Sequence, residues 1–255
     1  MHTFEGHLAV GDPEAPVRVV LFPYAGATPL SLLPVARHLP NECSVLLPGP
    51  TGTRRTTPPM VYVEAVEGLL PVVEAWADRP TVLYGHSLGA LITHSLLSLM
   101  SAVPLRRIRE VVLSGPPSPS RATSLAAHPE QPFTTRSPAS LEHELRSGGR
   151  LPEETTRHSV AVAEAVTLLG LDLHLFDTYV RPERRSGSRA RHHLWFGLDD
   201  PLSQDEAGSW ASELPSPPMI RSFPGTHFFP LEGEDVSREL GRLTRHLSSG
   251  VEQAT

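Results

Sequence analysis

Short apolar runs alternate along this chain with segments of helical periodicity, and no other feature limits the possible folds as strongly. The first run, residues 17–22 (VRVVLF), is rich in β-branched residues and ends at Pro23, so it predicts a buried strand. Further strands are expected at 43–47, 81–84, 109–113, 193–196 and 219–223, and helices at 29–38, 62–77, 87–100 and 236–247. Within 62–77 we expect Pro71 to kink or restart the helix. Such alternation favours an α/β fold with a mostly parallel central sheet flanked by helices.

From residue 116 to about residue 191 the alternation stops, over a length well beyond ordinary connections in compact domains. A Pro/Ser/Thr-rich stretch is followed by segments of helical pattern at 137–146, 153–169 and 172–179. The simplest interpretation is a helical cap, or lid, inserted over one end of the sheet. We therefore expect residues 1–255 to form a single domain with a cap insertion at about 116–191. Two carboxylates in the expected cap, Asp172 and Asp177, are interpreted as solvated or capping groups.

The charged residues and the cysteine count exclude several kinds of chemistry. All 22 basic residues are arginine, so Schiff-base and P-loop lysines are absent from the sequence. Cys43 is the single cysteine, which rules out an internal disulfide and cysteine-rich zinc sites. A net charge of −6 gives no general reason to bind nucleic acid or an anionic membrane. Residues 1–10 lack a signal-peptide pattern and no stretch approaches 18 apolar residues, so we expect a cytoplasmic protein.

Residues 85–89 (GHSLG) follow an expected strand and precede an apolar helix, which is the position of a nucleophile elbow. The serine of such an elbow occupies a sharp, strained turn, so the residues two before and two after it must be small. Gly85 and Gly89 meet that requirement around Ser87. The amino terminus of the following helix also favours developing negative charge. The segment predicts Ser87 as the nucleophile of an α/β-hydrolase fold.

A serine nucleophile needs a base, and the base must be oriented by an acid. In this architecture both follow the nucleophile in the chain, on loops after later strands. His227, which follows the last expected strand, is the candidate base, because the other twelve histidines fit that position less well. Asp199 and Asp200 both follow the strand before it. We prefer Asp200 as the acid, although spacing alone does not separate the two neighbours.

The oxyanion formed in acyl transfer is bound by two backbone N–H groups. The residue after the nucleophile, Leu88, should supply one of them. The other should come from the turn after the first parallel strand, residues 22–27 (FPYAGA). We expect Ala25 to be this second donor, with Tyr24 as the alternative.

Residues 181–193 (RPERRSGSRARHH) are locally basic, with five arginines around one glutamate. We interpret them as a solvated, mobile loop that returns from the cap. A docking site for an acidic carrier protein is the less favoured alternative.

Several segments resemble the type II thioesterases that accompany nonribosomal peptide and polyketide synthases. The most specific are LFPYAGA at 21–27 and FPGTHFF at 223–229, whereas YGHSLGA at 84–90 would suit many hydrolases. The others are LPGPTGTRR at 47–55, VVLSGPPSP at 111–119, LEHELRSGGRLPEE at 141–154, LLGLDLHLFDTY at 168–179 and FGLDDP at 196–201. The chain departs from the family pattern at Tyr24, where a histidine is usual, and at Ala27, where a second glycine is usual.

The resemblance implies a triad of Ser87, Asp200 and His227, with cap segments around Asp172 and Tyr179 covering the acyl pocket. It implies hydrolysis of acyl thioesters on the phosphopantetheine arm of an acyl or peptidyl carrier protein, which would free a stalled or mis-loaded carrier. No metal, organic cofactor, nucleic acid or membrane would take part, and we expect a monomer. A generic serine esterase or lipase acting on free small-molecule esters is the alternative, because the same triad serves many substrates. A catalytically silent binding protein is disfavoured because all three triad positions are filled.

Overall fold

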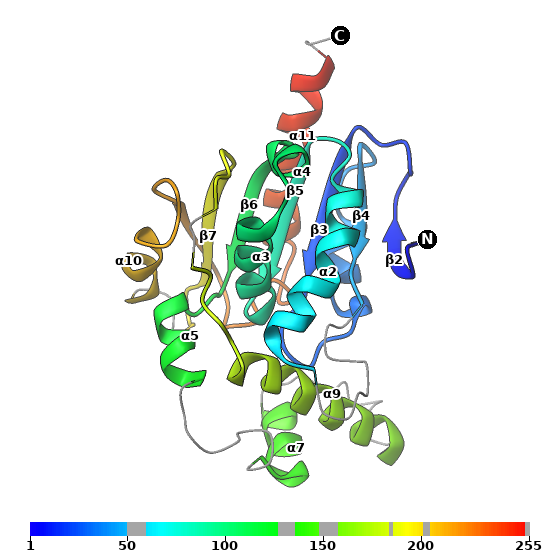
Figure 1. Ribbon diagram of the computed structural model, residues 1–255. Helices are drawn as coiled ribbons and strands as arrows, with labels where there is room; N and C mark the ends of the chain where they lie inside the picture. The colour runs from blue at the N-terminus through cyan, green and yellow to red at the C-terminus, as the bar shows by residue number, and fades with distance from the viewer. Residues whose placement is uncertain (50–59, 127–135, 148–157, 184–185, 201–204, 253–255) are drawn as a thin grey trace.

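The protein is described by a computed structural model over residues 1–49, 60–126, 136–147, 158–183, 186–200 and 205–252. In these residues one sheet forms the centre of the molecule, with the strand order β1-β2-β4-β3-β5-β6-β7-β8 (Figure 1). The strands are β1 (His2–Phe4), β2 (His7–Val10), β3 (Val17–Phe22), β4 (Cys43–Leu47), β5 (Thr81–His86), β6 (Ile108–Ser114), β7 (Arg191–Gly197) and β8 (Met219–Phe223). Strands β3 to β8 pair in parallel, whereas β1 and β2 run antiparallel to their neighbours. The expected α/β fold with a mostly parallel sheet is confirmed.

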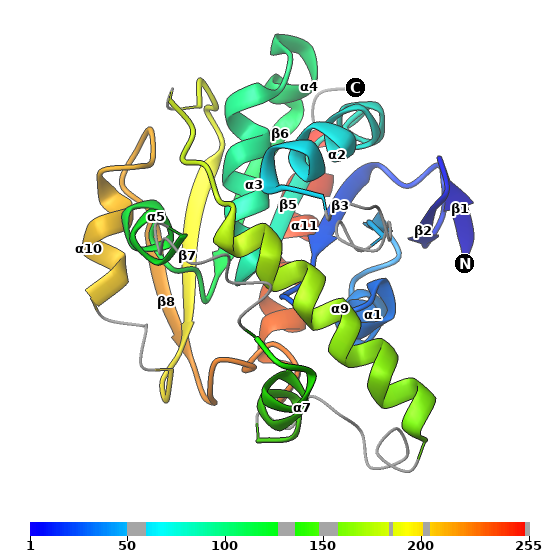
Figure 2. The same ribbon diagram turned by 60° about the horizontal axis from the view of Figure 1, so that its bottom comes forward.

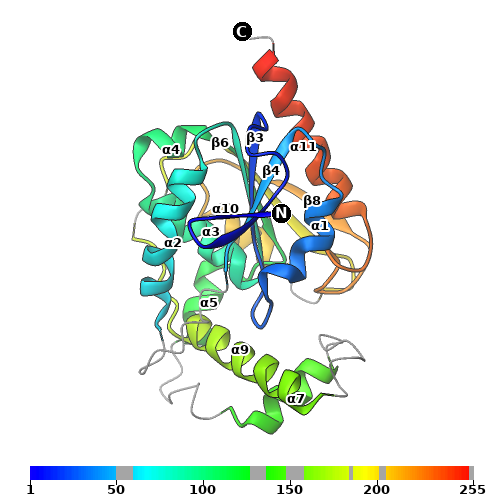
Figure 3. The same cartoon turned by 90° about the vertical axis from the view of Figure 1, so that its right-hand side faces the viewer.

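Helices cover both faces of the sheet (Figure 3). One face carries α2 (Tyr62–Trp76), α3 (Leu88–Leu99) and α4 (Ala102–Arg107), and the other carries η1 (Pro29–Leu32), α1 (Leu33–Arg37) and α11 (Asp235–Glu252). An apolar core fills the space on each side of the sheet. Strands β3, β4 and β5 are therefore buried at every residue, which explains why they read as continuous apolar runs.

Helix α2 continues through Pro71 and neither ends nor restarts there. A proline inside a helix removes one backbone hydrogen bond. The side chains of α2 from Tyr62 to Trp76 that face the sheet are buried in the apolar core, and this packing holds the helix together across the proline. The expectation of a restart at Pro71 is wrong because tertiary packing outweighs the local preference.

The edge hairpin β1–β2 was not predicted. Its turn consists of Glu5 and Gly6, which both have positive φ (46° and 82°), and Phe4 pairs with His7 across it. Two left-handed residues define a type I′ turn, which suits the twist of a hairpin. A non-glycine residue such as Glu5 is uncommon in this conformation, so the sequence signal for the turn is weak.

Three helices are described between β6 and β7, namely α5 (Pro119–Ala126), α7 (Pro138–Ser147) and α9 (Ser159–Asp177). Helix α9 crosses the carboxyl ends of the central strands, and α7 packs alongside it (Figure 2). The helices expected at 153–169 and 172–179 are one continuous helix in the described part, because Gly170 is buried within α9 and does not end it. Residues 153–157 lie outside the described residues. A further helix, α10 (Asp205–Ala211), lies between β7 and β8.

Helix α9 is the one described helix whose length and apolar composition would allow it to cross a membrane. Its most apolar window is 44% buried inside the protein. Asp172 and Asp177 of α9 are buried, and both accept hydrogen bonds from other segments of the chain. The expectation that these two carboxylates are solvated is therefore wrong. Buried, hydrogen-bonded carboxylates are typical of a helix packed within a folded domain.

The arginine-rich segment after α9 is held in place where it is described. Arg181 and Arg191 form ion pairs with buried glutamates, and the hydroxyl of the buried Ser186 donates to a backbone carbonyl of α3. The arginine side chains of this segment that are described are exposed, as expected of a solvated loop, although Ser186 and Ser188 are buried. The mobility of the loop stays a prediction. Arg184 and Arg185 lie outside the described residues.

Candidate active site

The turn between β5 and α3 holds Ser87 in a strained backbone conformation. Its φ is 55° and its ψ is −115°, a region that residues other than glycine occupy only where the surroundings impose it. Ser87 N donates to Ser114 O of β6 at 2.8 Å, which ties the turn to the neighbouring strand. This is the backbone geometry expected of a nucleophile elbow.

Gly85 and Gly89 permit two close backbone approaches around this turn. A Cβ on Gly85 would lie 2.2 Å from Gly89 O, so the end of the strand could not approach the start of the helix as it does. A Cβ on Gly89 would lie 2.4 Å from Phe22 O and 2.6 Å from Pro23 O. Gly89 therefore makes room for the backbone of the loop after β3 as well as for the turn at Ser87.

His227 and Asp200 meet beyond the carboxyl ends of β8 and β7. His227 Nδ1 lies 2.8 Å from Asp200 Oδ2. Asp200 is 3% exposed, whereas the neighbouring Asp199 is exposed to solvent. A Cβ on Gly197 would lie 2.1 Å from Thr226 O, so this glycine lets the two loops come together. Because Nδ1 is bound to the carboxylate, Nε2 is the ring nitrogen left to accept a proton.

His227 also lies against the elbow. The ring centroid of His86, the residue before Ser87, is 5.0 Å from that of His227. Gly115, directly after β6, lies beside both rings, since a Cβ there would be 3.0 Å from His86 Cε1 and 3.2 Å from His227 Cε1. Ser87, His227 and Asp200 therefore gather at the same end of the sheet.

His86 remains neutral in this cluster. Burial, reinforced by the neighbouring His227, lowers the pKa of His86 to about 3. Removal from water disfavours the imidazolium form. His86 Nδ1 lies 3.0 Å from both the carbonyl and the hydroxyl oxygen of Ser114. His86 therefore adds no positive charge beside His227.

Glu232 supports the loop that carries His227, and it was not predicted. Its carboxylate accepts hydrogen bonds from Thr226 N, at 2.9 Å, and from the Thr226 hydroxyl. A Cβ on Gly225, whose φ is 114°, would lie 2.2 Å from Glu232 Oε2, so this glycine makes room for the carboxylate. An acid five residues after the candidate histidine is a weak signal until the shape of the loop is known.

The loop after β3 forms a tight turn over residues 24–27. Ala27 N donates to Tyr24 O at 3.2 Å, and Gly26, the third residue of the turn, has a φ of 80°. These features match a type II turn, which favours glycine at that position. The Tyr24 ring packs edge-on against Phe228, with centroids 5.1 Å apart, so it fills space on the His227 side of the loop.

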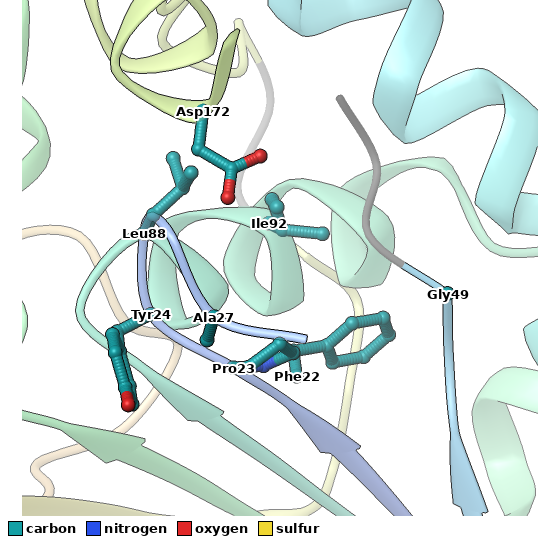
Figure 4. Close-up of a pocket in the computed structure, with 8 residues that line it drawn as sticks. All are labelled: Phe22, Pro23, Tyr24, Ala27, Gly49, Leu88, Ile92 and Asp172. Atoms are coloured by element: carbon teal, nitrogen blue, oxygen red, sulfur yellow. The ribbon is translucent and has the colours of Figure 1, made fainter. Parts of the chain in front are cut away.

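A small pocket lies between this loop, the amino end of α3 and helix α9 (Figure 4). Phe22, Ala27, Leu88 and Ile92 give it apolar walls, and the carboxylate of Asp172 enters it from α9. The expected oxyanion donors Leu88 and Ala25 belong to the two segments that meet here. Tyr179, whose segment the family resemblance places over the acyl pocket, packs against Tyr62 of α2, with ring centroids 4.9 Å apart.

No cluster of three or more histidine, cysteine, aspartate or glutamate side chains suited to a metal ion occurs in the part of the chain that the structure describes. The imidazole of His227 and the buried carboxylate of Asp200 pair at the same end of the sheet as the strained backbone turn of Ser87. That set is suited to nucleophilic acyl transfer.

Comparison with known proteins decides the family. Residues 17–247 match the thioesterase domain family. The chain belongs to the thioesterase family. A probable cadicidin biosynthesis thioesterase from Streptomyces griseus is 30% identical over 224 residues, which cover 84% of this chain and 58% of that protein. The chain thus spans less than two thirds of the length of this curated relative.

Solved structures of thioesterases share the fold. The type II thioesterase BorB from the borrelidin biosynthetic cluster matches with a TM-score of 0.74 and 27% identity, over 93% of this chain and 94% of that chain. RedJ, a thioesterase from the prodiginine biosynthetic pathway in Streptomyces coelicolor, matches with a TM-score of 0.74 and 22% identity, over 95% of this chain and 92% of that chain. The resemblance of this chain to type II thioesterases and its α/β-hydrolase fold are confirmed.

Proposed function

We propose that this thioesterase hydrolyses acyl thioesters on the phosphopantetheine arm of a carrier protein, by way of an acyl-Ser87 intermediate. The observation that carries the proposal is the hydrogen bond between His227 and Asp200 at the same end of the sheet as the strained Ser87 turn. Membership of the thioesterase family supports a thioester as the bond that is cleaved.

In the acylation step, Ser87 Oγ attacks the thioester carbonyl carbon while His227 Nε2 takes the hydroxyl proton. Asp200 orients the imidazole and stabilises the imidazolium that forms. Collapse of the tetrahedral intermediate breaks the carbon–sulfur bond, and the departing thiolate receives the proton from His227. In the second step His227 activates a water molecule, which attacks the acyl-serine ester and releases the free acid.

The negative charge on the tetrahedral oxygen is stabilised by backbone N–H groups. We assign the two donors to Leu88, at the start of α3, and Ala25, in the turn after β3, with Tyr24 N–H as the alternative to Ala25. The close approach of the β3 loop to Gly89 supports this assignment, because it brings both segments together. These steps require no metal or organic cofactor.

The cap insertion at about 116–191 within one domain, residues 1–255, is part of this proposal. The position of α9 across the carboxyl ends of the strands supports it. The named relatives belong to cadicidin, borrelidin and prodiginine biosynthesis, which supports a role in releasing acyl groups from carriers of a polyketide or nonribosomal peptide synthase. A monomeric state and a cytoplasmic location belong to the same proposal.

The test compares one acyl group in two forms. The purified protein is given acyl-loaded carrier proteins and, separately, the matching free acyl esters, and hydrolysis is followed by mass spectrometry. We expect a larger kcat/KM on the carrier-bound thioester. A strong preference for the free esters would instead support the generic esterase or lipase and overturn the carrier-protein assignment.

A further inference from the structure

We propose that Asp172 is a positioning residue for the turn at residues 24–27, which carries the proposed oxyanion donor Ala25. By accepting the hydrogen bond of Gly26 N–H, Asp172 holds this turn in the shape that the reaction requires. The inference rests on the proposed function and deepens it, since it assigns a task in the same reaction to a carboxylate of helix α9. It does not require Asp172 to touch the substrate.

The contact joins two segments that are far apart in the chain. Gly26 N donates to Asp172 Oδ2 at 2.7 Å, across 146 residues of sequence. Asp172 is 3% exposed, so this bond is shielded from water. A buried hydrogen bond to a carboxylate is worth more than one between neutral groups. Gly26 N belongs to the peptide group that joins Ala25 to Gly26. The bond therefore fixes the peptide group that directly follows the N–H of Ala25 in the turn.

A second contact joins the same two segments. A Cβ on Gly26 would lie 3.1 Å from Leu169 Cδ1 and 3.4 Å from Leu169 Cα, so the turn rests directly on the surface of α9. Leu169 and Asp172 are three residues apart and share one face of the helix. The turn is therefore attached to α9 both by packing and by a hydrogen bond.

The opposite side of the loop after β3 packs against α3, the helix that follows Ser87. Phe22 O and Pro23 O occupy the space that a Cβ on Gly89 would need. The loop thus lies between α3 and α9, and Asp172 supplies a polar contact on the α9 side. Donors of an oxyanion hole are effective only when they are held in place before the charge develops. A displacement of about 1 Å can cost about 100-fold in rate.

The chemistry of the contact predicts which property of Asp172 matters. A negative charge near the oxyanion would oppose its formation, so the useful feature is the oxygen that accepts the Gly26 hydrogen. The amide introduced by Asp172→Asn keeps such an oxygen, whereas Asp172→Leu removes it at similar volume. We expect Asp172→Leu to lower kcat at least 10-fold with little change in KM. We expect Asp172→Asn to stay within about threefold of the parent protein, since a neutral hydrogen bond retains part of the stabilisation.

Matched controls come from the same helix. Asp177 is also a buried carboxylate of α9, but it pairs with Arg136, just before α7, and so serves a different part of the cap. Asp177→Leu and Asp177→Asn should leave kcat unchanged per active site, even where they lower the melting temperature. The concentration of active sites is determined by titration with a fluorophosphonate. Each kcat is then calculated per active site, so that misfolded protein does not lower it.

A second readout separates positioning from general stability. A trifluoromethyl ketone forms a tetrahedral adduct with a serine nucleophile, and its oxygen requires the same donors as the transition state. Across the parent, Asp172→Asn and Asp172→Leu proteins, the inhibition constant should rise in proportion to the fall in kcat/KM. Should Asp172→Leu fail to fold, Asp172→Ala is measured in the same way.

The outcomes discriminate between the two proposals. If Ser87→Ala retains turnover, the proposed function fails whatever Asp172 does. If Ser87→Ala is inactive but the Asp172→Leu protein keeps its kcat and its inhibitor affinity per active site, only the positioning role is overturned. Equal losses in Asp172→Asn and Asp172→Leu would also overturn it, because the charge and not the hydrogen bond would then be required.

Discussion

Ser87 holds a backbone conformation that an ordinary serine in a turn would avoid, and its surroundings maintain it. The bond from Ser87 N to Ser114 O and the absence of side chains on Gly85 and Gly89 make the strained turn possible. Strain of this kind costs of order 1–3 kcal/mol and is typical of functional sites. The energetic cost is consistent with a residue selected for reactivity rather than for stability.

Replacement of Ser87, the proposed nucleophile, tests the assignment directly. We expect Ser87→Ala to abolish thioester hydrolysis and covalent labelling by a fluorophosphonate, because no hydroxyl remains to attack the carbonyl. Labelling is followed by mass spectrometry, and circular dichroism serves as the control for an intact fold. Labelling at a different serine in the parent protein would refute the assignment.

The two neighbouring aspartates provide a matched pair of variants. Asp200→Asn should lower kcat by about 10⁴-fold, because the amide no longer stabilises the correct imidazole tautomer or the imidazolium. Asp199→Asn should change kcat little, since Asp199 is exposed and Asp200 is the residue bonded to His227. Steady-state kinetics on an acyl-loaded carrier protein measure both. A larger loss in Asp199→Asn than in Asp200→Asn would reverse the assignment of the acid.

At the scale of elements, the site depends on glycines at which two backbones approach closely. Gly89 allows the β3 loop to reach α3, Gly197 allows the loops after β7 and β8 to meet, and Gly26 allows the β3 loop to rest on α9. Each contact joins segments that are distant in sequence. The arrangement of the site therefore follows from the packing of elements and not from any single motif.

Two glycine substitutions should have opposite effects. Gly89→Ala should lower both kcat/KM and the free energy of unfolding, the latter by about 1–3 kcal/mol, because its Cβ would collide with Phe22 O. Gly68→Ala should raise the free energy of unfolding by about 0.5–1 kcal/mol without affecting kcat/KM. Gly68 is an exposed residue of α2 with open space around its Cβ position. Urea denaturation measures the stability of both variants, and steady-state kinetics measure their kcat/KM. An unchanged kcat/KM in Gly89→Ala would contradict the role given to the close contact between the β3 loop and α3.

At the scale of the whole molecule, several histidines are buried in the neutral form. Burial lowers the pKa of His94 and of His192 to about 4 and that of His86 to about 3. In the unfolded chain these groups take up protons near pH 6.5. The unfolded state therefore binds more protons below that pH. The resulting stability is fully present above pH 6.5 and is lost as the pH falls towards 4.

We expect the free energy of unfolding to fall between pH 6.5 and pH 4, before most carboxylates titrate. His192 is 2% exposed, so His192→Leu should make this dependence shallower by removing one buried proton acceptor. The exposed His143 provides the control for loss of a histidine, as the variant His143→Leu. Urea denaturation at a series of pH values measures the slopes. Equal slopes in the parent and His192→Leu proteins would exclude His192 as a source of the pH dependence.

The strands of the sheet from β3 onwards and the elbow could be predicted because their signals are local. Buried strands appear as short apolar runs, and a nucleophile elbow requires glycines at fixed spacing around the serine. The hairpin β1–β2, the continuity of α9 and the support from Glu232 could not be predicted in this way. Their causes are an unusual turn conformation at Glu5, packing around Gly170 and the shape of the loop before His227.

The sequence by itself determined the fold class, the candidate nucleophile and the candidate base, because periodicity, motif spacing and chain order are written along the chain. Tertiary structure decided which of Asp199 and Asp200 faces His227. Adjacent residues have nearly the same distance along the sequence from the other candidate residues, and only the folded backbone determines where each side chain points. It also decided that Asp172 is buried against Gly26 rather than solvated. No local pattern predicts a hydrogen bond across 146 residues, because it forms only when α9 packs over the ends of the strands.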